Sequence, residues 1–200
     1  MLKKFVSVLF IINFIVFVSG CASYRAGSYP TKDILAYSNI QERGDLKIAA
    51  KFLDTNETRQ SFQRNLQDQG IEPVFLIMDN RSKDTYNFSK SMVNRNVIQA
   101  EEVAHRCRFG TGKRVASYGV LAILCWPFLI PAIIDGFGSS GANTRMRDDY
   151  IFKQIKDERI FPMGLLTGFL YIEKLKPGED LIIRLQNISS SEVALFRFNK

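Results

Sequence analysis

His105 and Cys107 are the residues whose side chains are best suited to metal binding or catalysis. His105 is the only histidine of the chain, and one histidine with one thiol falls short of the four ligands of a structural zinc site. The same pair would make a catalytic dyad only if the two side chains met, but residues two apart on a helix point in different directions. We therefore expect no catalytic residue, no metal and no cofactor, and keep an enzyme that uses His105 as a remote alternative.

Two other charged motifs are equally unspecific. Residues 110–113, Gly-Thr-Gly-Lys, have the end of a phosphate-binding loop, but Cys107 stands where that loop needs its first glycine. Asp148 and Asp149 form an adjacent carboxylate pair, and adjacent carboxylates alone specify no reaction. We expect this pair on a solvated helix face near two arginines of the same segment.

Cys21 is a candidate for covalent modification, because it follows an apolar leader. Lys3 and Lys4 precede an uncharged run from Phe5 to Val18. This run is shorter than the ~20 residues that span a hydrocarbon core, and it is typical of a secretory signal.

The end of the leader, Val18-Ser19-Gly20-Cys21, resembles the lipobox of bacterial lipoproteins. The resemblance implies a diacylglycerol thioether on Cys21, cleavage before it and acylation of the new amine, for example by palmitate. Several acyl chains anchor a protein firmly, since each buried methylene adds ~0.8 kcal/mol. Ala22 stands where an aspartate would imply retention in the inner membrane, so in a Gram-negative host the resemblance implies an outer-membrane protein facing the periplasm. An uncleaved signal anchor is the alternative, because Val18 replaces the usual leucine.

Removal of residues 1–20 leaves about 180 residues, enough for one domain. The net charge falls from +7 to +5 because the leader holds two lysines and no acidic residue. This excess is small for an exported chain of such length, so we expect no nucleic-acid partner. The polar segment 21–44 has no sustained period and is predicted to be a lipidated tether to a domain over 45–200.

Alternating or β-branched segments within 45–200 predict an antiparallel sandwich of the immunoglobulin-like type. The helix after the first strand is predicted over 55–69, with a capping box at Asp54 and Glu57 and a stop at Gly70. Seven strands are predicted, over 46–53, 71–78, 85–88, 93–98, 165–172, 181–185 and 193–198.

An insertion over about 100–158 separates the two groups of strands, and its residues 115–134 carry no charge. A single span would place the two groups on opposite sides of a membrane, where they could not share a sheet. We therefore predict an apolar helical hairpin that bends at 126–131, where two prolines interrupt the helix. If Cys107 and Cys125 share one helix, about 27 Å separates them, so we expect two buried free thiols.

The predicted hairpin has an apolar tip and a cationic base, which suits insertion into one lipid leaflet or contact with a partner. Small residues over 136–142 would let its arms approach closely. Packing against its own sandwich, or against a second copy, is the alternative. The residues predicted to contact membrane or partner are Tyr118, Leu121, Leu124, Trp126, Phe128, Leu129, Ile130 and Ile133, and those predicted to contact headgroups are Lys113, Arg114, Arg145 and Arg147.

The order of the lipobox, Gly-Ile-Glu-Pro-Val at 70–74, the apolar motif at 130–136 and Gly-Phe-Leu-Tyr at 168–171 resembles that of bacterial lipoproteins of uncharacterised function with an immunoglobulin-like domain. The resemblance implies architecture and no activity. We predict a non-enzymatic, lipid-anchored protein of the cell envelope that acts as an interaction or assembly module through its hairpin. A subunit of an oligomeric envelope complex or channel is the alternative.

Overall fold

Two four-stranded antiparallel sheets make up the larger of two compact units in this computed structural model, which describes residues 23–30, 32–109 and 129–200, without the side chains of 129–139. The larger unit comprises residues 26–107 and 147–200, and the smaller one 1–25 and 108–146. Sheet A has the order β1-β2-β3-β6, with β1 Ile40–Arg43, β2 Leu46–Phe52, β3 Ile71–Asn80 and β6 Leu165–Glu173. Sheet B has the order β5-β4-β7-β8, with β4 Tyr86–Phe88, β5 Glu158–Ile160, β7 Leu181–Asn187 and β8 Val193–Phe198.

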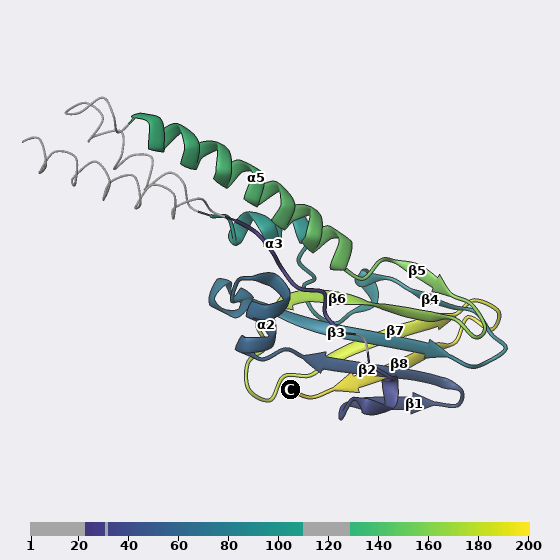
Figure 1. The fold of residues 1–200 in the computed structure, drawn as a ribbon. Coiled ribbons are helices and arrows are strands. Elements are labelled where there is room, and N and C mark those ends of the chain that lie inside the picture. Colours follow the sequence, from purple (N-terminus) through teal and green to yellow (C-terminus); the bar gives the residue numbers. More distant parts are fainter. Residues whose placement is uncertain (1–22, 31, 110–128) are drawn as a thin grey trace, which may run out of the picture. The chain divides into compact units, whose positions relative to one another are not determined.

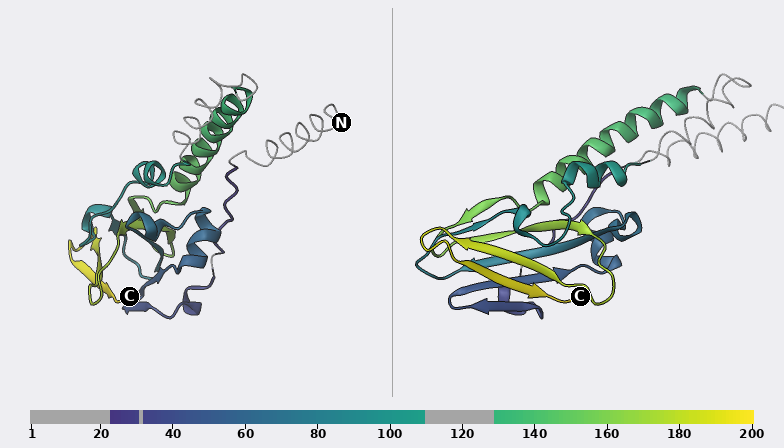
Figure 2. Two further views of the ribbon diagram at one scale, coloured as in Figure 1. Left: turned by 90° about the vertical axis from the view of Figure 1, so that its left-hand side faces the viewer. Right: turned by 180° about the vertical axis from the view of Figure 1, so that it is seen from behind.

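The hydrophobic core lies between the two sheets. Figure 1 shows β7 and β8 behind sheet A, and the right-hand view of Figure 2 shows the same two strands in front. Because side chains alternate along a strand, each sheet sends every second residue inward. The fully buried inward residues include Leu46, Ile48, Leu76, Met78, Leu170 and Ile172 of sheet A and Phe88, Leu181, Ile183, Leu185, Phe196 and Phe198 of sheet B. The prediction of a mainly β, sandwich-like fold is therefore confirmed.

The opposite face of sheet A is also covered, so that β3 is buried along its whole length. The ring of Tyr29 lies 4.6 Å from that of Phe75 and 5.3 Å from that of Phe169. Residues 21–44 are predicted to be a tether, but within this segment Tyr29 and Tyr37 pack on sheet A and residues 40–43 belong to it. They do so because the aromatic side chains of this segment bury apolar surface, and because residues 40–43 pair with β2 as β1.

Side chains of the β1 segment close one side of the sandwich. Gln41 accepts a hydrogen bond from the backbone N–H of Arg197 (3.0 Å) and donates one to its carbonyl. On either side, Asn39 donates to the carbonyl of Asn199 (3.0 Å) and Arg43 to that of Leu195 (2.7 Å). Alternate side chains along the β1 edge of sheet A thus form hydrogen bonds with the outward backbone groups of β8, the edge strand of sheet B. These bonds protect β8 from pairing with a strand of another chain.

Six of the seven predicted strands are confirmed, and the strand predicted over 93–98 is wrong. That segment holds only isolated bridges at Val93 and Val97. Beside Val93, Asn94 bonds Ile182 of β7 twice, through its side-chain oxygen (2.7 Å) and its own N–H (3.1 Å), so a side-chain oxygen stands where a strand would offer a backbone carbonyl. Strands β1 and β5 were missed because each is short and rich in charged residues.

The predicted helix over 55–69 is wrong in length. Its capping box is confirmed, since Asp54 accepts from two backbone N–H groups and Glu57 accepts from the N–H of Asp54 (3.0 Å). The helix, α2 Thr55–Phe62, ends because Gln63 adopts a left-handed conformation at φ 52°. A short 3-10 turn, η2 Leu66–Gln69, follows and ends at Gly70, which has φ 72°.

Gly168 allows a close approach on which the β6 edge depends. Its neighbour Phe169 accepts a backbone hydrogen bond from Ile155 (2.8 Å), just beyond the end of helix α5 Leu129–Lys153. A Cβ at position 168 would lie 2.7 Å from the Cα of Ile155, a separation that side chains do not tolerate. Only glycine fits here without a shift of the backbone.

Gly168→Ala should lower the free energy of unfolding by about 1–3 kcal/mol, because the new methyl group pushes residues 154–155 away from β6. Urea unfolding measures this change. The matched control is Gly141→Ala in α5, where a Cβ meets nothing within 4 Å and the better helix propensity should stabilise by ~1 kcal/mol. Equal stability of the Gly168 variant and the wild-type protein would contradict the close approach.

Candidate functional site: the base of the apolar insertion

The insertion joins two neighbouring strands of sheet B, since it follows β4 and precedes β5. In its described parts it contains helix α3 Ala100–Arg106 and helix α5 Leu129–Lys153, and the 3-10 turn η3 Lys90–Met92 lies between β4 and the insertion. The uncharged segment itself falls largely on residues 110–128, which lie outside the described residues. The structure therefore describes the base of the insertion rather than its tip.

Some of the predicted contact residues lie in the described part of the insertion and others lie outside it. Leu129, Ile130 and Ile133 belong to α5, and their side chains are not described. Arg145 and Arg147 are exposed on the same helix, and Arg147 pairs with Asp148 at 3.1 Å. The predicted residues outside the described part are Cys21, Lys113, Arg114, Tyr118, Leu121, Leu124, Trp126 and Phe128.

The predicted bend over 126–131 is wrong for residues 129–131, which are helical and belong to α5. Residues 126–128 lie outside the described part. The small residues of 136–142 all lie within α5.

His105 and Cys107 face different environments, as expected for residues two apart. His105 is exposed on α3, whereas Cys107 caps the end of this helix as a buried free thiol. The assumption that one helix carries both Cys107 and Cys125 is wrong, because α3 ends at Arg106. Within the described ranges, no three His, Cys, Asp or Glu side chains are grouped to hold a metal ion.

The chain just before the uncharged segment contacts the chain just after it. The backbone N–H of Phe109 donates a hydrogen bond to the side-chain oxygen of Asn143 at 2.9 Å. Both residues belong to the smaller unit. A contact between positions 109 and 143 is what a hairpin needs at its base, because it brings the outgoing and returning chain side by side.

The C-terminal part of α5, from residue 147, belongs to the larger unit and packs on the outer face of sheet A through Tyr150. The Tyr150 ring lies 5.2 Å from that of Phe62, edge to face. Its hydroxyl donates to the Phe62 carbonyl (3.2 Å), and the Tyr171 hydroxyl donates to the Tyr150 carbonyl (3.2 Å). These bonds satisfy the polar tips of two fully buried tyrosines and thereby join α2, α5 and β6.

Lys153 completes this attachment at the last residue of α5. Its side chain is only 9% exposed, and its ammonium donates to Ser61 O (2.6 Å), to Gly27 O (3.0 Å) and to the carboxylate of Asp149 (2.7 Å). The ammonium also lies 5.3 Å from the centre of the Phe62 ring. A buried ammonium is tolerated here because each of its three protons has an acceptor.

The predicted solvated face for the two adjacent aspartates is thus right for one of them. Asp148 is exposed beside Arg147, whereas Asp149 is partly buried and pairs with Lys153. The spacing of Asp149 and Lys153, four residues apart, is the signal that sequence reasoning passed over. The role of Tyr150 had no comparable signal, because its partners lie in α2 and β6.

Burial controls the ionisation of the polar groups at this base. Burial raises the pKa of the Cys107 thiol to about 11, although Arg64 and a hydrogen bond with Tyr150 act in the opposite direction. Burial likewise raises the pKa of Tyr150 and that of Tyr171 well above the usual range of a tyrosine. A neutral thiol is a poor nucleophile, so the base is suited to packing rather than to covalent chemistry.

None of the described helices is both long enough and apolar enough to cross a membrane. The chain matches no protein-family model, no curated protein and no solved structure.

Alkaline pH should destabilise the fold through Cys107. Its thiol ionises near pH 9 in the unfolded chain and only near 11 in the folded one, so the unfolded chain releases the proton first. The stabilisation from this group is complete below pH 9 and is lost as pH rises towards 11. Urea unfolding at intervals from pH 8 to 11 should show a shallower fall for Cys107→Ala than for the wild-type protein, and identical slopes would refute this assignment.

Proposed function

We propose that this chain is a non-enzymatic envelope lipoprotein, anchored by lipid on Cys21, whose immunoglobulin-like sandwich presents the insertion as an apolar helical hairpin to a membrane or a protein partner. The observation that carries the proposal is the pairing of strands across the insertion. β3 precedes the insertion and β6 follows it, and the two pair from Ile71 with Glu173 to Asp79 with Leu165. A single membrane crossing by residues 115–134 would separate strands that pair along their length.

The contact of Phe109 with Asn143 also supports a hairpin. It joins the chain shortly before the uncharged segment to the chain shortly after it. Arg145 and Arg147 follow on α5 and are exposed to solvent, Arg147 beside its ion-pair partner Asp148, so this part of the helix presents guanidinium groups to anionic headgroups or to an acidic partner. In this arrangement the apolar segment forms the end of the hairpin and the basic residues form its base.

The immunoglobulin-like assignment is supported by the order of the strands. In an immunoglobulin sandwich, strands A, B and E are neighbours in one sheet, and C′, C, F and G follow one another in the other. β2, β3 and β6 correspond to A, B and E, and β5, β4, β7 and β8 correspond to C′, C, F and G. The insertion then occupies the C–C′ connection, and β1 is an added edge strand.

A lipid on Cys21 would hold the sandwich close to the membrane. Tyr29 already packs on sheet A, so only seven residues, 22–28, separate the anchor from the folded domain. The eight Cα–Cα steps from Cys21 to Tyr29 span at most about 28 Å when fully extended. A hairpin arm of twenty helical residues is about 30 Å long, so a second contact with the same membrane is within reach.

An oligomeric envelope complex is the second candidate, and one observation favours it. Gly141 of α5 is exposed, and a side chain there would meet nothing within 4 Å. With Gly138 one turn before it, this glycine would allow close contact with the helix of another copy. No specific observation favours an enzyme, because His105 is exposed while Cys107 is buried.

The test compares the membrane retention of the full-length protein, of Cys21→Ser, and of Cys21→Ser with residues 115–134 replaced by a Gly-Ser linker. We expect Cys21→Ser to remain partly in the membrane fraction after carbonate extraction, and the linker variant to become soluble. The matched control replaces the exposed polar segment 189–192, the β7–β8 turn, with an equal number of glycines and serines in Cys21→Ser.

Release of Cys21→Ser alone would show that lipid is the sole anchor, and the membrane contact of the hairpin would be wrong. Retention of the linker variant would exclude the insertion as the second contact. Sedimentation of Gly138→Leu with Gly141→Leu separates the second candidate, because larger side chains should dissociate an oligomer built on α5 and leave a monomeric protein unchanged.

A further inference from the structure

The first part of the larger unit is attached to the sandwich by few bonds. Residues 26–30 and 32–38, which we call the strap, precede β1. Among the described residues, two hydrogen bonds join the strap to the rest of this unit, and both are at Gly27. Its N–H donates to the carbonyl of Gln60 (3.2 Å), and its carbonyl accepts from the ammonium of Lys153 (3.0 Å).

Three side chains pack the strap on the outer face of sheet A. The ring of Tyr29 contacts those of Phe75 and Phe169, but this tyrosine stays partly exposed, and its hydroxyl forms no hydrogen bond within the described ranges. Ile34 and Tyr37 are each 9% exposed. Most other strap residues are exposed to solvent.

The attachment becomes much stronger at Asn39, the residue after the strap. The carbonyl of Asn39 accepts from the N–H of Ala50 (3.0 Å), and its side chain donates to the carbonyl of Asn199 (3.0 Å). β1 follows at once and pairs with β2. Departure of the strap from sheet A therefore breaks no strand pairing.

The strap orders many residues for few interactions. Docking fixes the backbone of twelve described residues, five in 26–30 and seven in 32–38, and each ordered residue costs conformational entropy. Two hydrogen bonds and three packed side chains offset this cost. Segments with few buried contacts open at a smaller free energy than core strands do, so the strap is expected to leave the sheet while the sandwich stays folded.

We propose that the strap is a releasable part of the lipid tether and that Lys153 holds it in the docked form. Docked, it leaves at most about 28 Å of extended chain between Cys21 and Tyr29. Released, it extends the tether to Asn39, and the eighteen Cα–Cα steps from Cys21 span at most about 63 Å. The docked form suits contact of the insertion with the anchoring membrane, and the released form suits contact with a partner further from it.

The change in reach rests on the lipid anchor proposed above, whereas the release itself needs no lipid. Lys153 favours the docked form because its side chain is only 9% exposed. When Gly27 leaves, the ammonium keeps Ser61 and Asp149 as acceptors and loses the third. A buried ammonium with an unbonded proton costs free energy. Lys153 thus links the strap to the last turn of α5.

The test measures hydrogen exchange at single amides of the full-length protein in detergent. The Gly27 amide reports release, because its hydrogen bond to Gln60 breaks when the strap leaves, and the amides of β3 report unfolding of the sandwich. We expect Gly27 to be protected, but about a hundredfold less than the amides of β3.

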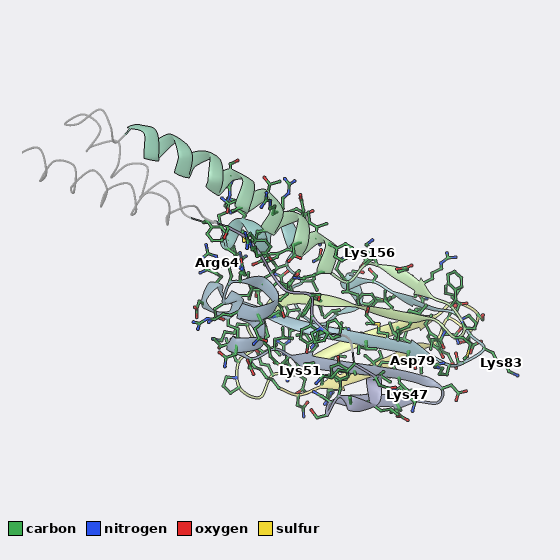
Figure 3. All side chains as sticks on the ribbon, in the orientation of Figure 1. Lys47, Lys51, Arg64, Asp79, Lys83 and Lys156 are labelled. Atoms are coloured by element: carbon green, nitrogen blue, oxygen red, sulfur yellow. The ribbon has the colours of Figure 1, made fainter. Side chains whose placement is uncertain are left out.

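Two variants test what holds the strap. Lys153→Met removes the bond to Gly27 and keeps an unbranched apolar side chain, so the Gly27 amide should exchange about tenfold faster relative to β3 in the same variant. Tyr29→Ala should act in the same direction, because it removes the ring contacts. The matched control is Lys156→Met. Lys156 lies beyond the end of α5 (Figure 3), is exposed and has no ion pair in the described part of the chain, so this variant should behave as wild type.

The change in reach is measured on vesicles of phosphatidylethanolamine and phosphatidylglycerol that carry the lipidated protein. The readout is energy transfer from a donor at position 190, in the exposed β7–β8 turn, to acceptor-labelled headgroups. Tyr29→Ala should lower the transfer, because it favours the longer tether. Equal transfer in this variant and the wild-type protein would overturn the change in reach.

Exchange of Gly27 as slow as that of β3 would overturn the release, because the strap would then open only with the sandwich. Exchange at the rate of an unprotected amide would overturn docking, and equal ratios in Lys153→Met and wild type would overturn the role of Lys153. Cys21→Ser should show wild-type exchange, so a missing release contradicts the strap and not the anchor, which carbonate extraction tests alone. If one variant fails to fold, β3 loses its protection, and the other variant decides.

Discussion

The pairing of β3 with β6 is the constraint on which the rest of this structure depends. The two strands stand on either side of the insertion, yet they are central and edge partners in one sheet along nearly their whole length. The long connection between them costs little additional entropy, because the entropic cost of closing a loop grows only with the logarithm of the loop length. What the pairing does require is that the chain return to the place it left, and the contacts of Tyr150 and Lys153 with α2 meet that requirement.

These contacts explain why an ammonium and two phenols are buried where apolar side chains would pack more simply. Burying a polar group costs free energy unless the group forms hydrogen bonds. Each of these groups therefore favours the one packing arrangement in which its hydrogen bonds are made. Lys153 reaches two backbone carbonyls at the end of α2 and in the N-terminal segment, and Tyr150 reaches a third. A purely apolar base would allow the end of α5 to slide, whereas this set of bonds specifies one position.

The strands that sequence reasoning predicted correctly are those with a clear period or a continuous apolar run, such as β7 and β3. β1 and β5 were not predicted because they have only four and three residues, two of them charged in each strand, and so show no clear hydrophobic period. The contacts at the base of the insertion were not predicted for another reason. Tyr150, Phe62 and Tyr171 lie far apart in the chain, and only the assembled sheet brings their rings together. The role of Gly168 is likewise a matter of distance to Ile155, which no local pattern encodes.

The two edge strands of sheet A, β1 and β6, differ in how far their surroundings are closed by hydrogen bonds. At β1 the side chains of Asn39, Gln41 and Arg43 bridge to β8 and close that side completely. At β6 the covering segment 154–155 stops at Phe169, and the strand continues uncovered past Thr167 to an exposed apolar turn. Open strand edges promote aggregation, and natural proteins commonly blunt them with charges, proline or a cover. This chain therefore protects one edge with three side-chain bridges, whereas at the other edge the backbone groups of Leu165 and Thr167 have no hydrogen-bond partner within the described ranges.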